Sequence, residues 1–259
     1  MRVLMIGDVV GKAGRKAVAA LFPALREEHG IDFFIANVEN SAGGKGITKE
    51  TLDELFAAGV NVATAGDHVF QNKGYGAIIG DARVVRPLNY PPGAPGHGWT
   101  VVPTAQGVPV AVVNLLGRTF MKPVDCPFAA AEKALEALAG TAAVCIVDMH
   151  AEATSEKVAM GWFLDGRVTA VCGTHTHVQT ADERVLPSGT AYITDLGMTG
   201  PYASVIGRGK DAVIAHFVTC LPQRFEVAEH DVRLCGAVID IDEQTGRARG
   251  IIRVQSALP

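Results

Sequence analysis

The sequence predicts an α/β protein, and two observations support this fold class. In the first half of the chain, short apolar runs bounded by Gly, Asp or Asn alternate with longer stretches whose apolar residues recur at helical spacing. The order strand-helix-strand-helix-strand requires crossover connections and therefore a parallel sheet. The last segment, residues 233–256, has two apolar runs joined by a Gly-containing turn, which is typical of a β-hairpin.

The first strand is expected at residues 2–8, where the run RVLMI meets Gly-Asp. The helix predicted over residues 12–30 places Val18, Phe22 and other apolar residues on one face, and Gly30 is a stop signal. A strand followed directly by a helix is the beginning of a β-α unit, and these local features predict one here.

The next elements repeat this alternation. A second strand is expected in IDFFIANVEN, residues 31–40, and a second helix at residues 48–59. Thr48 is the expected N-cap of that helix, because a hydroxyl can accept a free backbone N–H of the first turn. NVATAGDH, residues 61–68, is the expected third strand with its exit loop.

The middle of the chain is rich in Pro and Gly between extended runs, which predicts meandering strands and loops at residues 83–117. Further along, we expect helices at 128–140 and 155–166, and strands at 142–150 and 168–177. No internal repeat, low-complexity tract or linker interrupts the pattern, so a single domain is predicted for the whole chain, residues 1–259.

Composition excludes several classes of protein. The 259 residues are 48% hydrophobic and 19% charged, which is ordinary for a globular protein. The net charge of -4 argues against a stable nucleic-acid complex or membrane-surface binding, but it allows a nucleotide substrate. No signal peptide or apolar run of about 18 residues is present. With five cysteines and no CxxC pair, we expect a soluble, cytoplasmic protein without disulfides.

Side chains that can bind metal stand where the predicted strands end. Ligand sites in open α/β sheets lie beyond the carboxyl ends of the strands, so these residues are expected to meet. One polar strand end is commonplace, whereas the whole set predicts a metal site. The set comprises Asp8, Glu39, Asn40, Asp67, His68, His150, His175 and His177.

His175 and His177 stand in GTHTHVQT, directly after an apolar run. Residues i and i+2 of a strand point to the same side, so both imidazoles could face one metal centre. The alternative for this octet alone is a strand edge with two solvated histidines.

The ligand count suggests two metal ions. Imidazole and carboxylate ligands suit zinc, iron or manganese, and no cysteine is among the candidates. Paired cations about 3.5–4 Å apart can clamp the attacking and leaving oxygens of a phosphoryl transfer, with a shared hydroxide as nucleophile. The pattern therefore favours a phosphoester hydrolase.

At these residues the chain resembles the calcineurin-like metallophosphoesterases. The blocks GDVV, NVEN, GDH, DMHAE and GTHTH stand in the order of that superfamily's motifs, and the second and last are similar to its YmdB-like branch. The resemblance covers residues 1 to about 255. It implies a two-sheet β-sandwich flanked by helices and a phosphodiesterase for small phosphodiesters, 2′,3′-cyclic nucleotides in particular, with two irons.

The same resemblance implies a role for each residue. One metal would be bound by Asp8, Glu39, Asn40 and His177, and the other by Glu39, Asp67, His150 and His175. Glu39 would bridge the two ions, which would be divalent or trivalent iron, with manganese or zinc as alternatives. His68 would donate a proton to the leaving alkoxide. A small nucleotide phosphodiester is the expected partner, and a homo-oligomer is possible.

Two positions depart from the superfamily pattern. The first motif usually has His two residues after Asp8, but this chain has Val10, and Asn40 is the candidate replacement ligand. The third motif usually has Asn where this chain has Asp67. A further carboxylate there adds negative charge and could favour a more highly charged ion.

The sequence does not fix the roles of two glycine-rich stretches. AGGKGIT lacks Ser or Thr directly after Lys45, so it is not a phosphate-binding P-loop, and a flexible loop beside Glu39 is expected. GMTGPYASVIGRGKD, residues 197–211, could shape the mouth of the site or a subunit contact, and the sequence does not choose between them.

Other functions fit the residues less well. A metal-dependent amide hydrolase fits poorly, because amidohydrolase barrels carry His-x-His on their first strand. In this chain the motif comes much later, at residues 175–177 of 259. Metallo-β-lactamase-like hydrolases require His-x-His-x-Asp, and position 179 is Gln179. A regulatory or scaffolding protein with a metal site, or a phosphatase of other substrates, stays open as the alternative.

Overall fold

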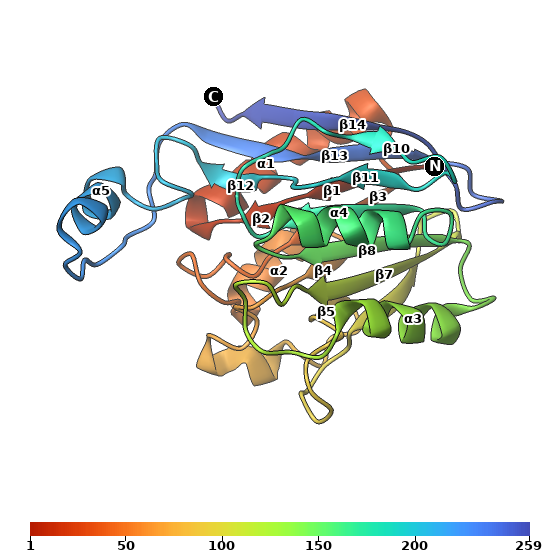
Figure 1. Cartoon of the computed structure of the whole chain (residues 1–259). Coiled ribbons are helices and arrows are strands. Elements are labelled where there is room, and N and C mark those ends of the chain that lie inside the picture. Colours follow the sequence, from red (N-terminus) through yellow and green to blue (C-terminus); the bar gives the residue numbers. More distant parts are fainter.

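The computed structural model describes all residues, 1–259, and contains two β-sheets packed face to face with helices on both outer sides (Figure 1). The predicted α/β two-sheet sandwich is therefore confirmed. The first sheet has the strand order β2-β12-β13-β1-β3-β4-β5, and β14 pairs with β13. Its strands are β1 (Arg2–Ile6), β2 (Asp8–Val9), β3 (Phe33–Asn37), β4 (Val62–Thr64), β5 (Val84–Val85), β12 (Met198–Pro201), β13 (Val232–Ile241) and β14 (Ala248–Ala257).

The second sheet has the strand order β10-β11-β9-β8-β7-β6. Its inner strands β11, β9, β8 and β7 run parallel, and the edge strands β10 and β6 run antiparallel to their neighbours. The strands are β6 (Trp99–Pro103), β7 (Pro109–Leu116), β8 (Val144–His150), β9 (Ala170–Thr174), β10 (Arg184–Val185) and β11 (Ala191–Ile193).

Alternation along the strands explains why two sheets pack together. Val3 and Met5 of β1 belong to a buried cluster that also contains Val112 of β7 and Ile146 of β8, so this cluster lies between the sheets. Leu4, between Val3 and Met5, belongs to a different cluster on the outer face of the first sheet. Because successive side chains point to opposite faces, a strand that is apolar throughout needs cover on both sides.

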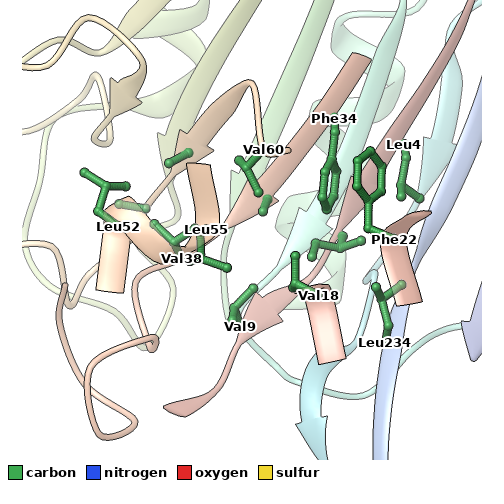
Figure 2. Packing of buried hydrophobic residues seen from close by; sticks show 14 of the residues in the cluster. Leu4, Val9, Val18, Phe22, Phe34, Val38, Leu52, Leu55, Val60 and Leu234 are labelled. Atoms are coloured by element: carbon green, nitrogen blue, oxygen red, sulfur yellow. The ribbon is translucent and has the colours of Figure 1, made fainter. Parts of the chain in front are cut away.

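Helices α1 (Gly11–His29) and α2 (Lys49–Ala57) cover the outer face of the first sheet. Phe22 of α1 stacks on Phe34 of β3 with ring centroids 4.1 Å apart (Figure 2). The predicted helix signals are confirmed: Gly30 ends α1 in the left-handed conformation, and the Thr48 side chain accepts the N–H of Thr51. The strands β1, β3 and β4 that these helices connect are parallel, as predicted.

Helices α3 (Pro127–Leu138) and α4 (Thr154–Phe163) cover the outer face of the second sheet. Their Ala134 and Met160 share one buried cluster with Val113 and Val147 of β7 and β8. The predicted C-terminal hairpin is also confirmed, because β13 and β14 pair antiparallel along their length. None of the helices is both long and apolar enough to cross a lipid bilayer.

One prediction about backbone conformation was wrong. The strand expected to run through His177 ends at Thr174, and His175 and His177 lie in the following loop with positive φ angles of 99° and 66°. Their side chains therefore converge through loop geometry and not through the two-residue repeat of a strand. The sequence did not predict the short elements β2, β10, β12 and the 3-10 helix Lys73–Ala77, and it set no bounds for α5 (Lys210–Thr219).

Candidate metal centre

The side chains predicted to bind metal come together, although both sheets contribute them. Strand ends of the first sheet bring the carboxylates, and strand ends of the second sheet bring histidines. This is the arrangement expected where the carboxyl ends of parallel strands meet. The positions are Asp8 in β2, Glu39 and Asn40 after β3, Asp67 and His68 after β4, His150 at the end of β8, and His175 and His177 after β9.

Four of these residues form a compact group. Glu39, Asp67, His150 and His175 each offer one ligand atom, and these atoms all lie within 4.8 Å of one another. Nε2 of His150 is 3.2 Å from Glu39 Oε1 and 3.5 Å from Asp67 Oδ1. The same nitrogen is 3.1 Å from Nδ1 of His175. Two imidazoles and two carboxylates around one point are a donor set that binds zinc, iron or manganese.

Unpartnered oxygen atoms support this interpretation. Glu39 Oε1 and Asp67 Oδ1 are buried and accept no hydrogen bond. Such atoms are rare in proteins, because an unsatisfied buried polar group costs about 1–3 kcal/mol. The other oxygen of Glu39 is occupied, since Oε2 accepts the backbone N–H of His68 at 3.0 Å. The free oxygens face imidazole nitrogens, so the residues present fit a bound cation.

Asp8, Asn40 and His177 form a second, adjacent group. Nε2 of His177 lies 3.6 Å from Asp8 Oδ1 and 3.1 Å from Asn40 Nδ2. His177 Nδ1 is 2.9 Å from the carbonyl oxygen of Ile206 and donates to it, so Nε2 faces Asp8 and can bind a metal ion once it is deprotonated. Asn40 presents its amide nitrogen here, so a ligand role for its oxygen requires the opposite orientation of the amide.

The loop that carries His175 and His177 is held by two buried carboxylates. Asp8 Oδ2 accepts the backbone N–H of His175 at 3.0 Å. Asp195 Oδ2 accepts both the N–H and the hydroxyl of Thr176, at 3.2 and 2.7 Å. Positive φ is unfavourable for residues other than glycine, and these contacts stabilise it. Asp8 thus positions one histidine with one oxygen and offers its other oxygen to the second group.

Hydrogen bonds beneath the site orient His150. Its Nδ1 is 2.9 Å from Thr174 Oγ1, and the Thr174 hydroxyl donates to Asp148 Oδ1 at 2.6 Å. Thr174 must therefore accept from Nδ1–H, so Nε2 of His150 faces Glu39 and can bind a metal ion once it is deprotonated. Burial raises the pKa of Asp148 to about 6, although its hydrogen bonds oppose the rise. The sequence analysis does not predict this support, although Asp148 begins the block DMHAE and shares one strand face with His150.

Two further contributions had not been singled out from the sequence. Glu152 Oε2 lies 3.2 Å from His175 Nε2, so His175 presents Nδ1 to the compact group. Gly66 leaves room for that group, because a Cβ at this position would lie 2.3 Å from His150 Nε2 and 2.4 Å from Glu39 Oε2. Both residues belong to sequence blocks already associated with the site, DMHAE and GDH.

The charges of the site are strongly coupled. Burial opposes ionisation of Asp8, but the nearby His177 and His150 outweigh it and lower the pKa of Asp8 to about 2. Neighbouring imidazoles likewise overcome burial and hold the pKa values of Glu39 and Asp67 well below their usual range. The carboxylates are therefore ionised at neutral pH. Facing them, the pKa values of His150 and His177 are raised despite burial, so metal binding would displace protons from these imidazoles.

His175 of the compact group and Asn40 and His177 of the second group line a polar cavity of about 310 Å³. Only one of its ten lining residues is hydrophobic, so it suits a charged or strongly polar ligand. The lining residues are Asn40, Gly44, Lys45, His68, Glu152, His175, Thr176, His177, Ile206 and Arg208.

Residues 4–254 match the family model described as YmdB-like protein. The chain belongs to the YmdB-like family. A 2′,3′-cyclic-nucleotide 2′-phosphodiesterase of Bacillus subtilis (strain 168) is 49% identical to this YmdB-like chain over 255 residues, which cover 98% of this chain and 96% of the relative. The family predicted from the sequence motifs is confirmed.

Solved structures agree with this assignment of the YmdB-like chain. A crystal structure of a hypothetical protein from Thermus thermophilus superimposes with a TM-score of 0.94 at 42% identity and covers 100% of both chains. A novel phosphatase from Mycoplasma pneumoniae has a TM-score of 0.93 at 35% identity, covering 99% of this chain and 93% of that one. The fold is thus shared along the whole length of these relatives.

Replacing Thr174 with Val is expected to weaken metal binding about 10–100-fold, the usual effect of losing a hydrogen bond behind a ligand. The variant keeps the side-chain shape but deprives His150 Nδ1 of its acceptor. Metal affinity is measured by competition with a chelator. Thr190→Val is the control, because Thr190 is also buried and its hydroxyl bonds only backbone groups away from the ligands. Equal metal affinity in both variants would show that Thr174 does not orient His150.

Replacing Lys157 with Met is expected to destabilise the metal-free protein by about 3–5 kcal/mol, because it leaves a buried charge unpaired. Lys157 Nζ contacts Asp195 Oδ2 at 2.6 Å, and the two side chains are 0% and 1% exposed. Urea unfolding measures the change. The same replacement at the exposed Lys133 should have little effect. Metal affinity should also fall, since Asp195 holds Thr176; unchanged stability and affinity would contradict both roles of the ion pair.

Proposed function

We propose that this YmdB-like protein hydrolyses 2′,3′-cyclic nucleotides with the help of two bound metal ions. The protein is an enzyme, a phosphodiesterase of the metallophosphoesterase type. One observation carries the proposal: two ionised carboxylates with buried, unpartnered oxygen atoms face imidazole nitrogens, and one of these imidazoles, that of His175, lines a polar cavity. The name of the Bacillus subtilis relative supports the choice of substrate.

The residues divide between two ions. Glu39, Asp67, His150 and His175 would hold one metal, and Asp8, His177 and Asn40 the other, with Glu39 shared. When bound, such a pair supplies a nucleophile for hydrolysis at neutral pH and stabilises the charge of phosphoryl transfer. The chain's own part is to fix the ligand geometry, through the contacts beneath His150, around Thr176 and at the Ile206 carbonyl.

His68 is the proposed proton donor to the leaving alkoxide. It lines the cavity, and its side chain is 21% exposed, so it can reach a bound substrate. Its ring lies beside the ligand candidates, with Nδ1 2.9 Å from Asn40 Oδ1 and 3.1 Å from Glu39 Oε1. In its protonated form the imidazole carries a second proton on Nε2, which it could transfer to the leaving oxygen as a general acid.

Lys45 and Arg208 are the proposed contacts for the anionic substrate. Arg208 is half-buried, makes no ion pair within the chain and donates to the carbonyl oxygens of Gly43 and Gly44. Burial without a counter-ion lowers the pKa of Arg208 and disfavours its charge. A phosphate group in the cavity would compensate that charge. Lys45 lines the same cavity and is exposed, which supports the use of its loop in substrate binding.

Iron is the proposed metal, with manganese or zinc as alternatives. A substitution at Asp67 tests whether the charge of the ligands determines which metal supports activity. Asp67→Asn should keep the fold and the capacity for two ions but change which metal supports activity, because one negative charge is lost from the compact group. The measurement is activity of metal-free protein reloaded with Fe, Mn or Zn. An unaltered metal preference would argue against Asp67 as a ligand.

The proposed function is tested by metal analysis of the purified protein together with hydrolysis assays. We expect about two ions per chain and hydrolysis of 2′,3′-cyclic nucleotides that a chelator abolishes. Two alternatives have distinct results. Metal binding without hydrolysis of any phosphodiester would favour a regulatory or scaffolding protein, and hydrolysis of phosphomonoesters alone would favour a phosphatase of other substrates.

A further inference from the structure

A single hydrophobic residue lines the polar cavity of the metal centre. It is Ile206, and 53% of this residue is exposed to solvent. The other residues around the cavity are glycine, polar or charged. Ligand sites combine polar groups with apolar surface, so an apolar side chain among polar ones fits the apolar part of a mixed ligand. Of the two roles that the sequence allows for residues 197–211, a place at the site is thus seen for this part of the segment.

Ile206 stands in a tight turn between Val205 and Arg208. The backbone N–H of each of these two residues donates to the carbonyl oxygen of the other, at 2.8 and 2.9 Å. The two central residues, Ile206 and Gly207, have positive φ angles of 44° and 94°. Two positive φ angles in a two-residue hairpin are typical of a type I′ turn, in which Asn, Asp or Gly is preferred at the first central position. Isoleucine is therefore an unusual residue for this position.

The conformation of Ile206 is strained. At positive φ the Cβ atom comes close to the following carbonyl oxygen, and a β-branched side chain makes the crowding worse. Strain of this kind is found mainly at functional sites. In the free protein the side chain gains little packing in return, because more than half of the residue is exposed. The turn would form more readily with Asn or Gly, so its backbone geometry gives no reason for an isoleucine.

Contacts on both sides hold the turn in place. The Ser204 hydroxyl accepts the N–H of Gly207 at 2.9 Å, and the carbonyl oxygen of Gly207 accepts the N–H of Ala228 at 3.0 Å. The carbonyl oxygen of Ile206 accepts Nδ1–H of His177 at 2.9 Å. The backbone of Ile206 is thus fixed at the edge of the cavity. A ligand contact made by a fixed residue costs little conformational entropy.

We propose that Ile206 contacts the nucleoside part of the substrate and so favours nucleotides over phosphate groups that carry no nucleoside. This inference rests on the proposed function and adds the residue that recognises the nucleoside. Arg208, a proposed contact for the anionic phosphate, lines the same cavity two residues further along the turn. In a 2′,3′-cyclic nucleotide the anionic phosphodiester is joined directly to the ribose. A charged contact beside an apolar contact matches this order of groups.

The side chain of Ile206 also limits what the contact can distinguish. It offers no hydrogen-bonding group, and the carbonyl oxygen of the same residue already accepts a hydrogen bond from His177. Discrimination between bases depends on hydrogen bonds to their edges, whereas apolar contact accepts any ring face. Ile206 should therefore favour purine and pyrimidine nucleotides alike.

Ligand binding tests the proposal. Ile206→Asn keeps the turn, because Asn tolerates positive φ, and it removes the apolar side chain. In the protein with its bound metal, this variant should bind a nucleoside 3′-monophosphate about 10-fold more weakly and inorganic phosphate with unchanged affinity. Titration calorimetry measures both affinities. Ile252→Asn is the matched control, because Ile252 is 52% exposed on β14, outside the cavity, and it should change neither.

Three results would overturn the proposal. An unchanged affinity of Ile206→Asn for the monophosphate would mean that the side chain meets no nucleoside. An equal loss of affinity for inorganic phosphate would mean that the substitution disturbs the metal centre instead. An unmodified protein that binds the monophosphate no more tightly than phosphate would have no nucleoside contact at all. None of these measurements uses catalysis, so a failure of the proposed hydrolysis is detected separately.

The stability of the metal-free protein gives an independent result. Ile206→Asn should raise the midpoint of urea unfolding, because the strain at positive φ is relieved. Ile252→Asn should give no such gain, since Asn is disfavoured in a strand. Higher stability together with weaker nucleotide binding is the result expected of a residue that serves binding and not folding. A lower midpoint for Ile206→Asn would show that the side chain supports the fold, and it would contradict the proposal.

Discussion

Replacing Glu39 with Gln is expected to remove both bound metal and hydrolytic activity from a protein that still folds. Glu39 is fully buried, and its free Oε1 faces His150 Nε2 at 3.2 Å and His68 Nδ1 at 3.1 Å. Gln preserves the shape but supplies no charge, and its amide nitrogen repels a cation. The loss of metal affinity should exceed the about 10–100-fold typical of residues behind a ligand. Metal content and chelator competition measure it.

A comparison with Glu152 separates the loss of a ligand from a general change of charge. Glu152→Gln removes a carboxylate 3.2 Å from His175 Nε2, but this group is half-exposed and lies outside the compact group. Its effect on metal affinity should remain within about 10–100-fold. Metal-free Glu39→Gln should unfold at a lower urea concentration than the metal-free parent, because the neighbouring imidazoles that lower the pKa of Glu39 lose their charged partner. Normal metal content in Glu39→Gln would exclude Glu39 as a ligand.

The positions of the site residues were predictable because the rule behind them is general. Parallel strands of one sheet present their carboxyl ends at one edge, so strands recognised from local apolar runs place Glu39 and Asp67 together, while His150 reaches them from the second sheet. The compact group in the structure contains these three residues and His175. The ligand roles themselves stay predictions until metal is measured.

The conformation and support of the site were not predictable from local pattern. The run VTAVCGTHTH reads as one strand, and nothing in it specifies the positive φ of His175 and His177. That conformation depends on Asp8, which is 167 residues away from His175, and on Asp195, which is 19 residues from Thr176. Contacts between residues so distant in sequence arise from the packing of the two sheets. The helix and strand propensities of a local segment carry no information about them.

His68→Ala is expected to retain its metal ions and lose about 10²–10⁴-fold in the hydrolysis of 2′,3′-cyclic nucleotides, the usual contribution of a general acid. A ribose alkoxide is a poor leaving group and gains from protonation as the bond to phosphorus breaks. A nitrophenolate leaves without such help, so a nitrophenyl phosphodiester should be hydrolysed with a much smaller loss. The ratio of kcat values for the two substrates, measured on protein of known metal content, is the quantity to follow.

The ratio of kcat values for the two substrates distinguishes proton donation by His68 from a role in ordering the site. His68 also contacts Asn40 and Glu39, and its backbone N–H donates to Glu39 Oε2, so it could serve only to order the site. The alanine variant keeps the backbone contact and removes only the ring, which makes loss of metal a sign of the ordering role. Glu152→Gln provides the reference, because it disturbs the same cavity and should slow both substrates alike. An equal loss on both substrates in His68→Ala would mean that the proton comes from another group.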